Sequence, residues 1–267
     1  MKAPVSVIIP CYRCDATIER AVRSIVSQTM VPEEVILVED FSDDGEKTVR
    51  ALNHVAEKYR GEIETLNVHK LERNHGPSAA RNAGWGLARQ PYIAFLDADD
   101  SWHPKKVEIQ YTWMAARAEV ALSCHRSTRL GPNQTAPKLT SAKDWVPVNR
   151  KVLLLSNRIA TRSVMVKRDV PYRFEVEKKH GEDYYLWLQI VLNGYPAWYL
   201  DMPLCYSYES DIGGGNLSAD LWKMEKGELD VYKRIFRDGL ISPVSYFVLS
   251  LISLAKYSRR VVVKSVL

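Results

Sequence analysis

The sequence predicts an α/β fold in which a mostly parallel sheet is flanked by helices and followed by a helical C-terminal tail. Short β-branched runs alternate with segments of helical periodicity from residue 5 to residue 96. Turn residues separate these segments. Such alternation is typical of parallel sheets with helices on both faces. A chain of 267 residues is long enough for one large domain with a smaller appendage.

The first strand and helix illustrate the pattern. The run VSVIIP at residues 5–10 ends at a proline, and the apolar residues between Ile18 and Val26 then fall on one helical face. Further strands are expected at residues 33–40, 63–71, 92–96, 119–125 and 162–167, and further helices at residues 48–59, 78–89 and 183–194.

The composition restricts the function. The net charge is +5, and 37 basic residues are interspersed with 32 acidic ones. This mild excess suits an anionic substrate or an anionic membrane surface, and it does not require nucleic acid. The four cysteines have no regular pair spacing, and the first residues already belong to a strand. We therefore expect a reducing cytoplasmic location, and we expect the C-x-x-C pair of Cys11 and Cys14 to be neither a redox nor a zinc site.

The stretch YIAFLDADDSWHP places three carboxylates, Asp97, Asp99 and Asp100, directly after a buried strand. Like charges this close repel each other, so a positive partner is expected. Oxygen ligands in this number suit Mg²⁺ or Mn²⁺, which proteins often hold with one or two carboxylates and the phosphates of a substrate. The alternative is an ordinary helix start capped by Ser101, and the two interpretations are compatible.

Four polar stretches follow four predicted strands: residues 10–12, 40–44, 74–81 and 97–100. Ligands bind open α/β sheets beyond the carboxyl ends of the strands. These stretches are therefore expected to converge on one crevice.

The tail is different in character. No charged residue occurs between Asp238 and Lys256, and a basic cluster of Lys256, Arg259 and Arg260 follows. The segment is short of the roughly 20 apolar residues that a spanning helix needs. Two interpretations of this segment remain: an interfacial helix on an anionic membrane surface, or a helix that packs on the protein's own core.

The motifs together resemble the family 2 glycosyltransferases of the GT-A fold, particularly bacterial members that build surface polysaccharides. The resemblance covers roughly the first 210 residues, in keeping with a single large domain. It rests on VSVIIPCY, SQT, EEVILVEDFSDDG, GPSAARNAG, FLDADDSW and GEDYYLWLQIV in that order. One departure is that Glu39, Asp40, Phe41 and Ser42 stand where the family usually has two aspartates, Gly and Ser.

The resemblance implies a Rossmann-like GT-A catalytic domain over residues 1–215. Within it, residues 1–120 would be the nucleotide-sugar half and residues 121–215 the acceptor half. Residues 216–267 would form a C-terminal helical segment outside this domain, for which membrane association and packing on the core are both open.

The resemblance also implies site roles for the donor. Pro10 and Tyr12 would line the base and ribose, Asp40 would accept a hydrogen bond from the base, and Arg81 would lie near the diphosphate. Asp99 would bind Mn²⁺ or Mg²⁺, with Asp97 at the ribose or the metal. For Asp40 and Arg81 the structural alternatives are a turn residue and an exposed helical arginine.

For catalysis, the resemblance implies an inverting transfer with Asp183 as the base and Glu182 as its orienting partner or an acceptor contact. The structural alternative is that both are favourable acids in the first turn of a helix.

The implied function is a metal-dependent, inverting hexosyltransferase that moves a sugar from a nucleotide-sugar, expected to be a UDP-sugar, to a saccharide acceptor. The acceptor is expected to be lipid-linked, in the synthesis of O-antigen, capsule, exopolysaccharide or lipopolysaccharide, at the inner face of the cell membrane. One alternative is a polyprenyl-phosphate glycosyltransferase, disfavoured because no pair of spanning helices is evident. The other is a non-catalytic nucleotide-sugar-binding module, which predicts the loss of Asp97, Asp99 or Asp183.

Overall fold

The structure is a computed structural model that describes residues 1–131, 137, 139, 144–178, 180–208 and 221–266. These residues divide into two units. The first comprises Met1–Pro147, Ile159–Pro171 and Pro196–Glu209, and the second comprises Val148–Arg158, Tyr172–Tyr195 and Ser210–Leu267. The boundary expected near residue 215 lies outside the described residues.

The first unit holds the strands β1 (Lys2–Cys11), β2 (Val31–Glu39), β3 (Thr65–Lys70), β4 (Tyr92–Phe95), β5 (Ser101–Trp102), β6 (Leu122–Leu130), β7 (Trp145–Pro147), β8 (Met165–Lys167) and β9 (Ala197–Tyr208). Its helices are α1 (Ile18–Val26), α2 (Lys47–Lys58), α3 (Pro77–Leu87), α4 (Lys106–Ala115) and the short 3-10 helix η1 (Thr161–Ser163). The second unit holds α5 (Arg150–Leu155), α6 (Glu182–Leu192), α7 (Leu221–Arg237) and α8 (Pro243–Val266).

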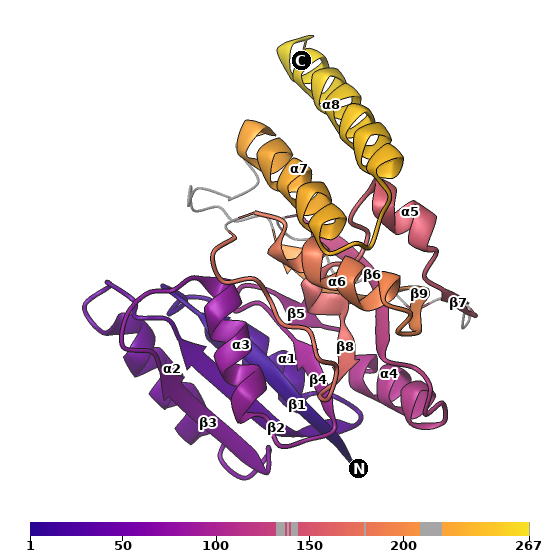
Figure 1. Cartoon of the computed structure of the whole chain (residues 1–267). Coiled ribbons are helices and arrows are strands. Elements are labelled where there is room, and N and C mark those ends of the chain that lie inside the picture. Colours follow the sequence, from indigo (N-terminus) through magenta and orange to yellow (C-terminus); the bar gives the residue numbers. More distant parts are fainter. Residues whose placement is uncertain (132–136, 138, 140–143, 179, 209–220, 267) are drawn as a thin grey trace. The chain divides into compact units, whose positions relative to one another are not determined.

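The described strands form one sheet in the order β3-β2-β1-β4-β8-β6-β9-β5, and β7 pairs with β9 (Figure 1). The β3-β2-β1-β4 segment is parallel throughout, which confirms the predicted α/β core. β8 then joins β4 antiparallel, and β6 and β9 pair parallel to each other. The short strands β5 and β7 both pair antiparallel with β9.

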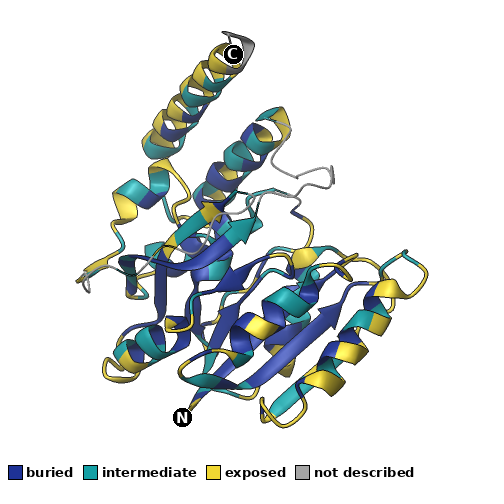
Figure 2. Ribbon diagram, turned by 180° about the vertical axis from the view of Figure 1, so that it is seen from behind, coloured by how far each residue is buried: buried dark blue, intermediate teal, exposed yellow. Residues whose placement is uncertain are grey.

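Alternation along β1 sends side chains to both faces of the sheet, as a strand period of two residues requires. Val7 and Ile9 pack in the core cluster that includes residues of α1, α2 and α4. Ile8 faces α3, where a Cβ on Gly84 would lie only 2.5 Å from the Ile8 side chain. Gly84 therefore lets α3 approach the sheet closely. Figure 2 shows these strands as a buried layer between partly exposed helices.

The second unit is helical, and its helices join through polar contacts as well as apolar ones. The Asn149 side chain caps α5 by accepting from the N–H groups of Lys151 and Val152. α7 and α8 pack against each other, and the buried Ser253 donates a hydrogen bond to Glu225 at 2.7 Å. The helix predicted at residues 183–194 is α6.

Over the part of the chain that the structure describes, no helix combines the length and apolar character needed to cross a bilayer.

Candidate active site

The carboxyl ends of β2, β1 and β4 lie side by side in the first unit because these strands are neighbours in the sheet. The register pairs Pro10 with Val38 and Cys11 with Glu39, and the main-chain N–H of Leu96 donates to the carbonyl of Ile8. The loops after the three strands therefore start from one edge, as the sequence predicted for this crevice. Pro10 itself is half-buried within β1.

Asp97 is held by an arginine. The Arg81 Nη2 donates to Asp97 Oδ1 at 2.7 Å, and the Arg81 side chain is only 9% exposed. α3 carries this arginine toward the end of β4, so Arg81 is not an exposed surface residue. The pair places a fixed positive group at the strand ends, where an anionic ligand would bind.

A second arginine, Arg162 of η1, was not anticipated from the sequence. Its Nη1 lies 3.1 Å from Asp100 Oδ2 and 4.0 Å from Asp97 Oδ2. The Arg162 Nε also donates to the Ser127 hydroxyl at 2.8 Å. Burial, followed by the nearby charge of Asp97, raises the pKa of Asp100 to about 8. Asp100 is thus a buried carboxyl that stabilises the turn after β4 through its contact with Arg162.

Asp99 differs from its neighbours because it is exposed. No ion pair to its carboxylate is found among the described residues, whereas Asp97 and Asp100 each contact an arginine. Desolvation and the charge of Asp97 raise the pKa of Asp99. Arg20 donates to its main-chain carbonyl and so orients the turn. Of the three carboxylates, Asp99 is the one presented outward.

Asp40 is buried, with 3% of its surface exposed. Its two carboxylate oxygens accept from the main-chain N–H groups of His75 and Gly76, both at 2.8 Å. Burial raises its pKa, and these two hydrogen bonds act in the opposite direction. Asp40 therefore fixes the loop that leads into α3, a structural role that sequence reasoning had left as the alternative to base recognition.

Tyr12 is exposed and is positioned by the loop after β2. Its hydroxyl donates to Asp43 at 2.8 Å, and Arg13 forms two hydrogen bonds to the same carboxylate, both at 2.6 Å. These donors lower the pKa of Asp43. The loops after β1 and β2 are thus tied together beside the carboxylates.

Cys11 and Cys14 are both buried and free. Burial, reinforced by the neighbouring Cys14 thiol, raises the pKa of Cys11. A protonated, buried thiol is unreactive, which is consistent with packing rather than redox chemistry.

The candidate base, Asp183, belongs to the second unit. Asp183 and Glu182 occupy the first turn of α6, directly after Gly181, whose φ is +72°. Asp183 Oδ1 accepts from the N–H of Tyr184 at 2.6 Å, and Asp183 Oδ2 accepts from Asn157 Nδ2 at 3.3 Å. Tyr184 and Trp187 are buried, so they are core residues of this unit.

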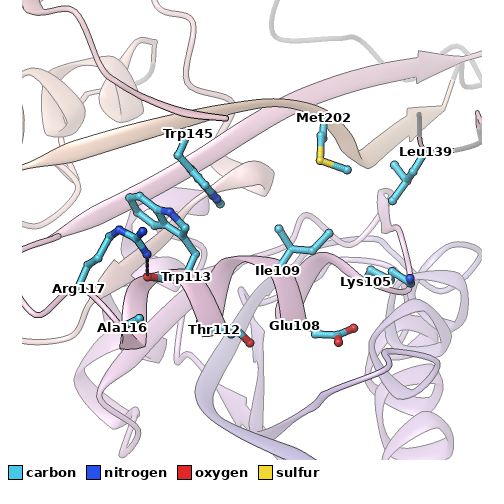
Figure 3. A pocket seen from close by; sticks show the side chains of 10 residues that line it. All are labelled: Lys105, Glu108, Ile109, Thr112, Trp113, Ala116, Arg117, Leu139, Trp145 and Met202. Carbon is cyan, nitrogen blue, oxygen red and sulfur yellow. Dashed lines mark hydrogen bonds between the residues drawn. The ribbon is translucent and has the colours of Figure 1, made fainter. Parts of the chain in front are cut away.

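A separate hollow of about 720 Å³ follows α4 in the first unit (Figure 3). The indole rings of Trp113 and Trp145 stack in its wall with centroids 4.4 Å apart, and Arg117 lies over Trp113. It is lined by Lys105, Glu108, Ile109, Thr112, Trp113, Ala116, Arg117, Leu139, Trp145 and Met202. None of the predicted site residues belongs to it.

Comparison with known proteins decides the family. The profile of the family described as Glycosyl transferase family 2 matches residues 6–181, which span both the strand-end carboxylates and Gly181 before α6. The chain belongs to glycosyltransferase family 2. The suspected family is thereby confirmed.

Individual relatives support this assignment. One relative is the Escherichia coli UDP-Glc:alpha-D-GlcNAc-diphosphoundecaprenol beta-1,3-glucosyltransferase WfgD. This chain is 27% identical to WfgD, and the alignment covers 85% of this chain and 84% of WfgD. The fold of this chain matches residues 1–349 of Staphylococcus aureus TarS in complex with UDP-GlcNAc at a TM-score of 0.69 and 20% identity, over 95% of this chain and 72% of that TarS chain. It also matches the mannosyltransferase PcManGT of Pyrobaculum calidifontis, in complex with GDP-Man and Mn²⁺, at a TM-score of 0.66 and 19% identity, over 96% of this chain and 70% of that chain. The GT-A fold is therefore confirmed for this glycosyltransferase.

Proposed function

We propose that this glycosyltransferase is a metal-dependent, inverting hexosyltransferase that transfers a sugar from a UDP-sugar to a lipid-linked saccharide in bacterial surface-polysaccharide synthesis. One observation carries the proposal. At the shared edge of β2, β1 and β4, Arg81 and Arg162 engage Asp97 and Asp100, and Asp99 is the exposed member of the three carboxylates after β4. The UDP and the acceptor class are supported by the substrates in the name of WfgD and by the UDP-GlcNAc bound to TarS.

The donor diphosphate is proposed to bind beside Arg81, with Pro10 and Tyr12 along the base and ribose. Asp40 would contribute a remaining carboxylate lone pair to the base N–H, because each of its oxygens already accepts one main-chain hydrogen bond. Arg81 is anchored by Asp97, so its guanidinium is held ready for phosphate oxygens at little further loss of side-chain freedom.

The carboxylate oxygens of Asp97 and Asp99 are ligands suited to a hard divalent cation. Within the described ranges no cluster of three or more metal-binding side chains occurs, so these residues alone form no closed cage. Asp99, with Asp97 beside it, instead suits Mn²⁺ or Mg²⁺ held jointly by the carboxylates and the diphosphate. When bound, the cation would neutralise the charge that develops on the departing nucleoside diphosphate. The Mn²⁺ bound to PcManGT is consistent with this assignment.

The transfer step requires a base for the acceptor hydroxyl. In the proposed reaction the acceptor oxygen bonds to the anomeric carbon, the bond from that carbon to the diphosphate oxygen breaks, and Asp183 receives the hydroxyl proton. The Asn157 amide, which donates to Asp183 Oδ2, would hold the carboxylate in one orientation. Glu182 would contact the acceptor or orient Asp183.

The tail supports an acceptor at a membrane surface. One side of α8 packs on α7, where Lys256 pairs with Glu228 and Arg260 pairs with Glu225. Much of the remaining surface of α8 is exposed (Figure 2). The exposed residues include large apolar side chains, a pattern typical of interfacial helices. These residues are Val244, Phe247, Val248, Leu251, Ile252, Leu254, Val261, Val262 and Val263. We therefore propose that the enzyme works at the inner face of the cell membrane.

The proposal is tested by titration calorimetry with UDP, GDP and dTDP, each with and without Mn²⁺. One nucleotide should bind in a metal-dependent manner, and Asp99→Ala should abolish the metal dependence. Asp169→Ala is the matched control, because Asp169 is an exposed aspartate of the first unit that is distant in sequence from the strand-end carboxylates. No nucleotide binding by the wild-type protein would refute the proposal.

A second assay separates the alternatives. Transfer of the sugar to a diphospho-linked saccharide acceptor supports the proposed reaction. Transfer to polyprenyl phosphate alone would favour the polyprenyl-phosphate transferase instead. Binding of the nucleotide-sugar without turnover on any acceptor would favour a binding module.

A further inference from the structure

Phe41 has an unusual main-chain conformation directly after Asp40. Its φ is +52°, in the left-handed region that β-carbon-bearing residues rarely adopt. Arg13 and Glu46 share this property among the described non-glycine residues. Phe41 is the bulky apolar member of the three, and 54% of its surface is exposed. A strained conformation that leaves a phenyl ring in solvent needs a compensating reason.

The conformation is imposed by fixed contacts on both sides of Phe41. On one side, Asp40 is buried, its carbonyl accepts from Asn74 Nδ2 at 2.9 Å, and its N–H donates to the Cys11 carbonyl at 2.9 Å. On the other side, the Ser42 N–H donates to Glu39 Oε1 at 2.7 Å. The loop after β2 therefore has little freedom to withdraw the ring.

Tyr12 lies in the loop directly after the neighbouring strand, β1. β1 and β2 are paired up to Cys11 and Glu39, and Tyr12 and Phe41 follow those residues by one and two positions. Two hydrogen bonds connect the loops: the Arg13 N–H donates to the Ser42 hydroxyl at 3.1 Å, and the Tyr12 hydroxyl donates to Asp43. Within the described part of the first unit, Tyr12 and Phe41 are the exposed large aromatic residues.

We propose that Phe41 is a nucleobase-binding residue that, with Tyr12, forms an aromatic clamp on the base of the donor nucleotide. This inference rests on the proposed function, because it assumes a nucleotide at the ends of β1 and β2. A flat base offers a π-face to an aromatic ring, and stacking tolerates any base. The clamp therefore contributes affinity for the base, while hydrogen bonds in the site choose among bases.

The experiment measures binding of UDP and of ribose 5-diphosphate, which lacks the base, to the full-length protein with Mn²⁺. GDP or dTDP replaces UDP if it binds more tightly. Phe41→Gly and Phe41→Asn remove the ring but suit a left-handed main chain. Both should raise the Kd for the nucleotide about tenfold, in line with the loss of one stacked ring. The Kd for ribose 5-diphosphate should stay within about twofold of the wild-type value, because a lost stack concerns only the base.

Two controls complete the test. Glu46 precedes α2 and also has a left-handed main chain, with φ at +64°. Glu46→Gly removes the strain at that position and should leave nucleotide affinity unchanged. Phe41→Tyr keeps a ring and should retain wild-type affinity.

Each outcome has a separate meaning. Equal affinity of Phe41→Gly and wild type for the nucleotide overturns the clamp and leaves the proposed function standing. Equal weakening of both ligands would also overturn it, since Phe41 would then act only through loop geometry. A wild-type protein that binds neither ligand removes the proposed function itself.

Discussion

The guanidinium of Arg162 joins Asp100 and Asp97, with its Nη1 lying 3.1 Å from Asp100 Oδ2 and 4.0 Å from Asp97 Oδ2. The Asp100 side chain is 4% exposed, so its carboxyl has little access to water, and its pKa of about 8 leaves it charged only in alkaline solution. A buried carboxylate without a cationic partner is strongly destabilising. Arg162 thus compensates the carboxyl groups of Asp97 and Asp100 in the turn after β4, whereas the Asp99 side chain is exposed to solvent.

At pH 9.5, where the Asp100 carboxylate is charged, Arg162→Met should therefore lower the free energy of unfolding by about 2 kcal/mol, because it leaves that carboxylate without its partner. Adding Asp100→Asn to the same protein should recover most of the loss, since no uncompensated charge remains. Urea unfolding of the two single variants and the double variant measures this coupling. Additive losses would show that the pair has no energetic link.

Asp183→Asn should remove turnover and leave donor affinity near the wild-type value. The amide keeps the size of the side chain but does not accept the acceptor proton. Activity should fall at least about 100-fold, in keeping with the contribution of a general base. The measurement pairs a sugar-transfer assay with nucleotide calorimetry, and Glu177→Gln, at an exposed acid of the same unit, serves as the control. A parallel loss of donor affinity in Asp183→Asn would assign Asp183 a structural role.

Lys106 predicts a pH dependence of stability. It is fully buried, its Nζ lies 3.7 Å from the centre of the Trp102 ring, and burial lowers its pKa from 10.5 to about 7. The unfolded chain therefore binds more protons than the folded protein between those two values, so folding becomes more favourable as the pH rises through this window.

Relative to Lys106→Met, the wild-type free energy of unfolding should increase by about 2 kcal/mol between pH 7.5 and pH 9.5, close to the limit for one proton. Urea unfolding of both proteins at each pH gives this difference, and other titrating groups cancel in the comparison. Parallel pH profiles for the two proteins would contradict the prediction.

The exposed face of α8 predicts membrane binding. Phe247→Glu with Leu251→Glu should reduce cosedimentation with anionic phosphatidylglycerol vesicles about tenfold or more, because charges then enter the apolar interface. Both side chains are more than half exposed, at 64% and 51%, so thermal stability should change little. Lys233→Glu on α7 is an exposed control for the added charge. Unchanged vesicle binding by the double variant would locate membrane affinity elsewhere or exclude it.

The sequence predicted the alternating elements, and β1 to β4 with α1 to α3 confirm them, because hydrophobic period and turn residues are local signals. It also predicted that the strand-end motifs converge, since parallel neighbours end at one edge. Arg162 had no such signal. It lies 62 residues beyond Asp100, and it reaches the site because β8 pairs antiparallel with β4, a pairing that local pattern does not encode.

Residue identity and spacing by themselves determined the α/β class and the set of candidate carboxylates, and the ordered motifs carried the resemblance to the family. Only the tertiary structure distinguished among those carboxylates: Asp40 is occupied by main-chain donors, Asp97 and Asp100 are engaged by arginines, and Asp99 is exposed. It also showed the strained main chain at Phe41 and the one-sided packing of α8. The physical reason is that burial, charge compensation and main-chain strain depend on groups brought together from distant parts of the chain.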